Sequence, residues 1–196
     1  EVVADVAKTR ETPIAFSNID AKQLAEEASS RELVMVLNST PGVYATESGG
    51  GSGDSRINIR GFDQRYIAGM IDGVPMNDME NGQIYWSNWG GLSMAARSIQ
   101  IQRGLGASKL ALPSVGGTIN IITKGIDQKA SAVVRQDITD YGLNTTSFAA
   151  NTGNLKGNWG LVVGAAKRWG HEWANATPVN EWDYFLKIQK RFKKHL

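Results

Sequence analysis

The chain has 196 residues, 41% of them hydrophobic and 20% charged, a composition typical of a globular protein and too apolar for a disordered one. Lysine and arginine number 21 against 19 acidic residues, and the net charge of +2 gives no reason to expect a nucleic acid partner. The lack of cysteine excludes disulfides, thiolate metal sites and a cysteine nucleophile. No apolar run approaches the ~20 residues of a membrane helix, and Glu1-Val2-Val3 does not look like the start of a secretory signal.

A first short helix is predicted after Asp20, whose carboxylate can cap its N-terminus. Gln23 stands three residues later, where it can complete a capping box. Ile19 before the cap and Leu24 inside the helix can form a hydrophobic staple.

A second helix is predicted before a glycine-rich loop. Ser29 and Glu32 repeat the capping-box spacing, and Pro41 ends the apolar periodicity that follows. From Ala45 to Ser55 the chain is rich in glycine and serine and offers little apolar surface to bury, which predicts a mobile loop.

Four strands are predicted from alternation of polar and apolar residues, the period of a half-buried strand. They cover Arg56–Arg60, Tyr66–Ile71, Ser98–Arg103 and Gly117–Thr123. Asp72-Gly73 closes the second strand with a tight turn, and Gly116-Gly117 opens the last one at a point suited to close backbone approach. Together with the helices, these strands predict a small mixed sheet.

The residues after Gly125 form longer alternating segments, in which three strands are predicted. In the last one, apolar and polar side chains take opposite faces, with Phe185 and Lys190 as exceptions. Segments of about ten residues with tryptophan near their ends are typical of transmembrane barrel strands. The tryptophans concerned are Trp159, Trp169, Trp173 and Trp182. A soluble meander with one solvated face has the same alternation, so periodicity leaves both readings open.

Four ordered blocks resemble the plug of TonB-dependent outer-membrane receptors. They are Leu33 to Val43 (LVMVLNSTPGV), Ile57 to Phe62 (INIRGF), Met70 to Asp78 (MIDGVPMND) and Gln102 to Lys124 (QRGLGASKLALPSVGGTINIITK). The resemblance implies an α+β plug domain, a small mixed β-sheet with flanking short helices and loops, over residues 1–126. It also implies that residues 127–196 are the first roughly three antiparallel strands of a transmembrane β-barrel, so that the chain is a fragment.

The resemblance further implies a receptor rather than an enzyme, without cofactor or metal, in the outer membrane of a Gram-negative bacterium. Such a plug gates the import of an extracellular ligand: siderophore-bound iron, haem, a cobalamin or a glycan. The implied partners are TonB, which pairs with the receptor by strand addition, the rest of the barrel, and membrane lipid. The open alternative is a soluble periplasmic signalling or adaptor module that reuses the plug fold.

Ligand contact is expected from loops at the plug apex, which in the family face the cell exterior. The candidate residues are Gly51, Asp54, Asp63, Gln64, Tyr66, Asn77, Tyr85, Trp86 and Trp89. Aromatic faces beside amide groups can stack on a ligand and bond its rim. Equally, the two tryptophans can pack against the barrel wall.

The resemblance also implies ionic contacts between plug and barrel through Arg60 and Arg103. The family often has an acidic residue before the second arginine, and Gln102 stands there instead, which weakens the expected contact. The segment Glu1-Val2-Val3-Ala4 has a weak likeness to the box that TonB binds.

An enzyme reading has little support. The run from Gly104 to Lys109 follows a predicted strand and has the first two glycines of a dinucleotide fingerprint, but lysine replaces the third. His171 and His195 are the only histidines, too few for a metal cluster and poorly placed for a catalytic triad.

Overall fold

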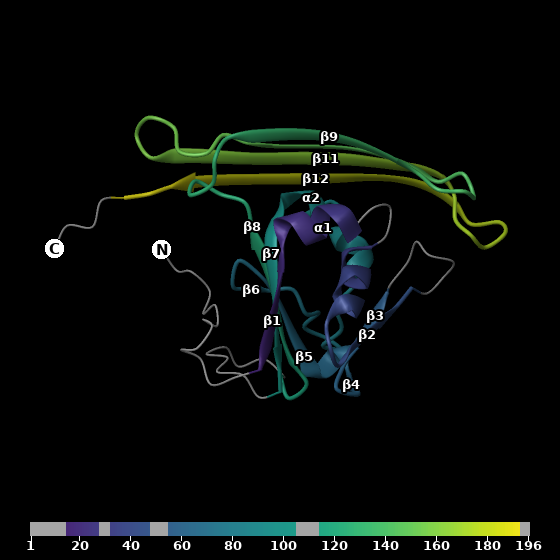
Figure 1. Cartoon of the computed structure of the whole chain (residues 1–196). Coiled ribbons are helices and arrows are strands. Elements are labelled where there is room, and N and C mark those ends of the chain that lie inside the picture. The colour runs from purple at the N-terminus through teal and green to yellow at the C-terminus, as the bar shows by residue number, and fades with distance from the viewer. Residues whose placement is uncertain (1–14, 28–31, 48–54, 105–113, 193–196) are drawn as a thin grey trace.

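The computed structural model describes residues 15–27, 32–47, 55–104 and 114–192, in which an N-terminal domain packs under a long four-stranded sheet (Figure 1). The domain holds a mixed five-stranded sheet in the order β1-β7-β8-β5-β6, with β5 and β8 parallel and the other pairs antiparallel. Its strands are β1 Phe16–Asp20, β7 Ala96–Arg103, β8 Gly117–Thr123, β5 Ile67–Ile71 and β6 Val74–Pro75. The strands predicted at β3, β5, β7 and β8 are confirmed.

The rest of the N-terminal domain consists of short helices and a small antiparallel sheet. The helical segments are α1 Ala21–Glu27, η1 Leu33–Ser39, η2 Gln64–Tyr66, η3 Trp86–Trp89 and α2 Leu92–Ala95. The sheet is β2 Val43–Thr46, β3 Arg56–Ile59 and β4 Phe62–Asp63. Within the described residues, no helix is long and apolar enough to cross a membrane.

The N-terminus of α1 is capped as predicted. The Asp20 carboxylate accepts the backbone N–H groups of Lys22 at 3.0 Å and Gln23 at 2.9 Å. No capping-box hydrogen bond from the Asp20 N–H to Gln23 is found among the described residues; the Gln23 amide nitrogen donates to the carboxylate of Glu27 and the hydroxyl of Ser39. The second predicted helix is present as the 3₁₀ segment η1, and its proposed Ser29 cap lies outside the described residues.

One face of the five-stranded sheet forms the core of the domain. Its central side chains are fully buried isoleucines from β7 and β8: Ile99, Ile101, Ile119 and Ile121. They share one cluster with Leu24 of α1, Leu37 of η1 and Ile57 of β3, so the helices and the small sheet cover this face. The staple residue Ile19 is also buried in that cluster.

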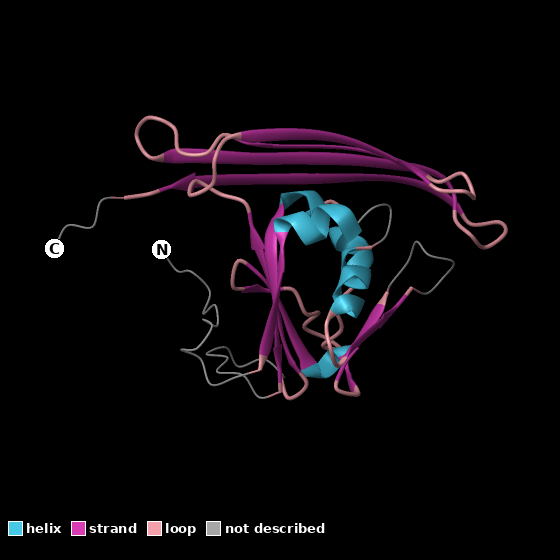
Figure 2. Cartoon of the chain, viewed as in Figure 1, coloured by secondary structure: helices cyan, strands magenta, loops and turns pink. Residues whose placement is uncertain are grey.

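The C-terminal part forms one antiparallel sheet of four strands, where the sequence pattern predicted three (Figure 2). The strands are β9 Ser131–Ile138, β10 Asn144–Asn151, β11 Trp159–His171 and β12 Pro178–Lys190, in the order β12-β11-β10-β9. The prediction missed one strand because β9 and β10 are short, and a brief turn joins them at Thr139 and Gly142.

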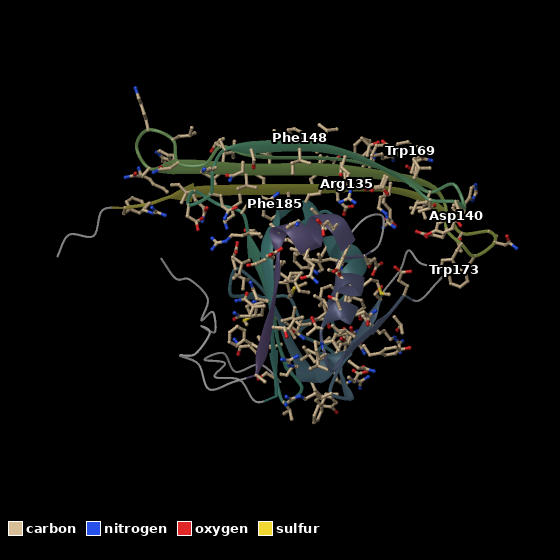
Figure 3. All side chains as sticks on the ribbon, viewed as in Figure 1. Arg135, Asp140, Phe148, Trp169, Trp173 and Phe185 are labelled. Carbon is tan, nitrogen blue, oxygen red and sulfur yellow. The ribbon has the colours of Figure 1, made fainter. Side chains whose placement is uncertain are left out.

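The two faces of this sheet differ. The inner face, which looks toward the N-terminal domain, carries Arg135 and Phe185, and the outward face carries Phe148 and Trp169 (Figure 3). Because side chains alternate along a strand, every second residue of β9–β12 belongs to each face.

Candidate functional site

The predicted apical residues at Asp63–Tyr66 lie in a tight bend. Asp63 caps η2, and its carboxylate accepts the Arg65 backbone N–H at 3.1 Å and the Arg65 Nε at 3.0 Å. The backbone N–H of Arg65, supported by the guanidinium, lowers the pKa of Asp63 below its ordinary value, although partial burial acts in the opposite direction. Gln64 is buried, whereas Tyr66 is half exposed.

A second loop in which apical residues were predicted, Met76 to Gly91, packs beside the first. The Gln64 amide donates to the Gln83 side-chain oxygen at 2.6 Å, and Gly82 lies so close to Arg65 that an added Cβ would meet its carbonyl oxygen at 3.4 Å. The structure therefore brings two of the predicted loops together. The glycine-rich loop, with Gly51 and Asp54, lies outside the described residues.

Asn77 holds the second loop in shape. Its Oδ1 accepts the Gly69 N–H at 2.8 Å, and its Nδ2 donates to the carbonyl oxygens of Ile67 at 2.9 Å and Gly82 at 2.8 Å. Both amide protons are thus used within the protein, which leaves little hydrogen-bonding capacity for a ligand.

The three aromatic candidates of this loop differ in accessibility. Tyr85 is 36% exposed, and its hydroxyl accepts a hydrogen bond from Asn81 at 2.7 Å. Trp86 is only 3% exposed and belongs to the core, and Trp89 packs against the core. Tyr66 and Tyr85 are therefore the predicted aromatic residues that a ligand can reach directly.

Arg60 and Arg103 lie together beside Gly42, where an added Cβ would approach the side chain of each. Arg60 has a φ of 52° and Gly61 a φ of 83°, so the dipeptide Arg60-Gly61 forms the tight turn between β3 and β4. Arg103 donates to the carbonyl oxygen of Pro41 at 2.9 Å. Ionic contact of these arginines with a barrel wall stays a prediction.

A different ion pair joins the N-terminal domain to the four-stranded sheet. Lys187 of β12 places its Nζ 2.7 Å from Asp72 Oδ2 and 2.7 Å from the Thr123 hydroxyl. Asp72 also accepts the Thr123 backbone N–H at 2.9 Å. Sequence reasoning assigned Asp72 only to its turn, although the polar position of Lys187 on β12 was a signal for an inward-facing cation.

Further polar contacts follow the same interface. Arg135 donates to the Ala25 carbonyl oxygen at 2.7 Å, and Gln189 accepts the Ile126 N–H at 3.0 Å. The Gly91 N–H bonds to the carboxylate of Asp183. A Cβ at Gly91 would come within 2.8 Å of the Asp183 Cβ, so glycine is required for this approach.

A cavity of about 160 Å³ lies between the helices of the N-terminal domain and the inner face of the sheet. Trp86 and Thr145 line it, and Trp86 Nε1 and Thr145 Oγ1 are buried there without a partner among the described residues. Lys124, also in the lining, donates to the Met94 carbonyl oxygen at 2.8 Å, and burial lowers its pKa. The interface therefore contains polar groups and is incompletely filled.

The far end of the sheet carries a buried acid in the turn between β11 and β12. Glu172 is 5% exposed and pairs with Arg168 at 3.2 Å. Burial raises the pKa of Glu172, the charges of Glu47 and Glu181 add to the effect, and Arg168 opposes it. The interaction with Glu47 indicates that the β2–β3 hairpin lies at this same end of the molecule.

These features define a domain held by charged and polar side chains against the inner face of a β-sheet wall. The family model of the TonB-dependent Receptor Plug Domain matches residues 8–118, more than half of the chain. The chain belongs to this family, whose members are transporters and not enzymes.

The relatives include transporters of two kinds. The chain is 28% identical over 148 residues to the vitamin B12 transporter BtuB of Vibrio vulnificus, covering 73% of this chain and 24% of that protein. It is 30% identical over 129 residues to the ferric enterobactin receptor of Pseudomonas aeruginosa, covering 60% of this chain and 17% of the receptor. The chain thus spans about a quarter or less of the length of these relatives.

Solved structures give the same fold. The crystal structure of BauA, the ferric preacinetobactin receptor from Acinetobacter baumannii, matches with a TM-score of 0.75 at 16% identity, over 95% of this chain and 27% of that one. The unliganded ferric citrate transporter FecA matches with a TM-score of 0.68 at 23% identity, over 91% of this chain and 29% of that one. Matches this complete include the four-stranded sheet as well as the plug.

Proposed function

We propose that this chain is the plug and the adjoining barrel wall of an outer-membrane importer, in which the plug gates the passage of a ligand from the cell exterior. The observation that carries the proposal is the asymmetry of the four-stranded sheet. Its inner face holds the plug through Lys187, Arg135 and Asp183, while its outward face exposes large apolar side chains. A wall between lipid and a polar lumen needs this division.

The alternative of a soluble periplasmic module fits the outward face poorly. Tyr184, Leu186 and Ile188 follow one another on that face and are 74%, 66% and 63% exposed. Contiguous apolar surface of this kind marks a site of contact with a membrane or another protein.

The proposed cargo is a ferric siderophore or a cobalamin, with haem and glycans as the remaining candidates. Support comes from the named relatives, which transport vitamin B12 or bind ferric enterobactin. Tyr66 and Tyr85 offer exposed rings for stacking beside the apical polar groups. Binding of each candidate cargo to the whole receptor is measured by titration. Replacing both tyrosines with alanine is expected to weaken the affinity for the cargo that binds. Unchanged affinity for every cargo would remove these residues from the site.

Energy for import is proposed to come from TonB, bound to the segment Glu1–Ala4 by strand addition. This segment lies outside the described residues. In this mechanism, a pull on the N-terminal segment rearranges the plug against the wall. The cavity between plug and wall suits such movement, because it leaves space into which side chains can shift.

The gating proposal is tested by a reversible lock. Because the chain contains no cysteine, the double variant Gly91→Cys, Asp183→Cys introduces a single candidate disulfide between plug and wall. The present approach of 2.8 Å between the two Cβ positions is about 1 Å below disulfide spacing, so a small shift accommodates the bond.

In the whole receptor, we expect uptake of labelled cargo to stop when this disulfide is oxidised and to return on reduction. The reduced form of the same variant is the matched control, because it also lacks the Asp183 carboxylate but has no disulfide. Undiminished uptake through the oxidised receptor would contradict a gate that moves against this wall.

A further inference from the structure

The outward face of β9–β12 carries no carboxylate. Only three acids occur in the four strands, namely Asp137, Glu181 and Asp183, and all three line the interior cavity. Any cation on the outward face therefore has no acidic neighbour on that face of β9–β12.

An apolar band crosses this face between two tryptophans of β11. Trp159 and Trp169 are ten residues apart, or about 33 Å at ~3.3 Å per residue. With a strand tilt of about 40°, this spans ~25 Å of membrane, the usual height of the apolar band of an outer-membrane barrel. From Trp159 up to Lys167 the outward cross-strand rows are apolar, for example Val134–Phe148–Ala165–Tyr184.

Lys167 lies just inside the band edge marked by Trp169. Its Nζ sits 4.7 Å from the centre of the Trp182 ring, its partner across β12, and also donates to Asn180 Oδ1. On its other side Lys167 pairs in register with Thr146, whose hydroxyl donates to Gln136. A cation is thus fixed among neutral hydroxyl and amide groups at the boundary of an apolar band.

We infer that Lys167, with Trp182 and Asn180, binds the phosphate of an anionic lipid headgroup in the leaflet at this end of the barrel. The inference rests on the proposed membrane placement of the sheet. The lysine stem lies along apolar surface while its ammonium reaches the headgroup level, and the indole face orients it. The Asn180 side-chain amide, whose oxygen accepts from Lys167, has N–H groups that supply further hydrogen bonds to phosphate oxygens.

The opposite end of the band lacks the same surroundings. Lys190 lies over the Trp159 ring at 4.6 Å and over the Phe192 ring at 5.3 Å. Its direct cross-strand partner is Trp159, and no hydroxyl or amide side chain pairs with it in the described register. Lys190 thus has a charge beside aromatic rings, as Lys167 does, whereas the neighbouring polar side chains occur only at Lys167.

The test compares two lipids that differ only in the phosphate. The whole receptor is placed in phosphatidylcholine nanodiscs that contain either phosphatidic acid or diacylglycerol with the same acyl chains. Native mass spectrometry then counts the doped lipid retained by the protein. We expect retention of phosphatidic acid to be about five-fold higher, equivalent to ~1 kcal/mol for one lysine at an anionic surface.

Variants assign this preference to the site. Lys167→Met should abolish it, Lys167→Arg should keep it, and Lys22→Met, which removes the same charge from α1, should leave it unchanged. Quenching of tryptophan fluorescence by brominated phosphatidylcholine reports insertion separately. Quenching with no preference for phosphatidic acid, or a preference that survives in Lys167→Met, overturns the phosphate site alone, whereas absence of quenching contradicts the membrane placement itself.

Discussion

Lys187 on β12 and Asp72 in the β5–β6 turn are 115 residues apart in sequence, and their charged atoms lie 2.7 Å apart across the boundary between plug and wall. The pair is partly shielded, with side-chain exposures of 19% and 33%. It shares the Thr123 hydroxyl, which donates to the Asp72 carboxylate at 2.5 Å and accepts from Lys187. This network is a charged link between the two parts.

Breaking this link should loosen the plug. We expect Asp72→Asn to cost about 1–3 kcal/mol of plug stability, because a partly buried ammonium loses its counterion while asparagine still tolerates the φ of 49° at this turn. Denaturant unfolding of the receptor, monitored by amide exchange in β8, gives the value. Lys187→Met and the double variant complete a cycle, and additive effects of the two substitutions would contradict a direct coupling.

Phe185 is the apolar anchor of the same interface, since it packs against the plug core from the inner face of β12. We expect Phe185→Ala to destabilise the docked plug by about 1–3 kcal/mol, less than for a fully buried phenylalanine because the side chain is only half buried. Tyr184→Ala is the control, since this neighbour points outward. Equal losses of docking stability in both variants would refute the assignment of faces.

Gly117 is required by the backbone at the start of β8. Its φ is 147°, and an added Cβ would lie 2.2 Å from the carbonyl oxygen of Gln102. Gly117→Ala should therefore prevent the normal pairing of β7 with β8 and reduce the yield of folded protein sharply. Gly164→Ala should be tolerated, because its Cβ would make only ordinary contacts at 3.6 Å or more. Thermal unfolding of the two variants measures the difference.

The turn at Glu172 should respond to pH. Because burial raises the pKa of Glu172 in the folded state, its stabilising effect is fully present below the ordinary value of 4.5 and is lost as pH rises through the folded value. The Glu172 amide, which bonds to the Thr177 carbonyl oxygen, should exchange faster at higher pH after correction for the intrinsic rate. Glu172→Gln should remove this dependence, and an unchanged profile in that variant would contradict it.

Much of the plug was predictable from local pattern. Strands β3, β5, β7 and β8 alternate cleanly, and Asp20 caps its helix because the cap involves residues only two or three positions away. The proposed close backbone approach at Gly116-Gly117 is also confirmed, since an added Cβ on Gly117 would lie 2.2 Å from the Gln102 carbonyl oxygen. Such features depend on neighbours in sequence or on glycine chemistry.

The site was less predictable, because it depends on how distant segments meet. Alternation predicted the two faces of β12 but did not explain the two residues that break it. Phe185 is an apolar residue on the inner face because it packs against the plug core. Lys190 is a charged residue on the outward face, where it lies beside Trp159 at the edge of the apolar band. The pairing of Lys187 with Asp72 follows from the docking of two separate sheets, which no local pattern encodes. Trp86 was a ligand candidate in the sequence, and tertiary packing places it in the core cluster instead.

The place of β1 at the edge of its sheet has a mechanical consequence. β1 pairs only with β7, and it precedes every other described strand of the plug. A tensile load applied ahead of Phe16 therefore reaches β1 first and, if directed away from the sheet, breaks its hydrogen bonds with β7 one after another rather than all at once. The β7–β8–β5 ladder stays intact while β1 peels away, so the weakest fracture line of the plug lies beside the strand nearest the load.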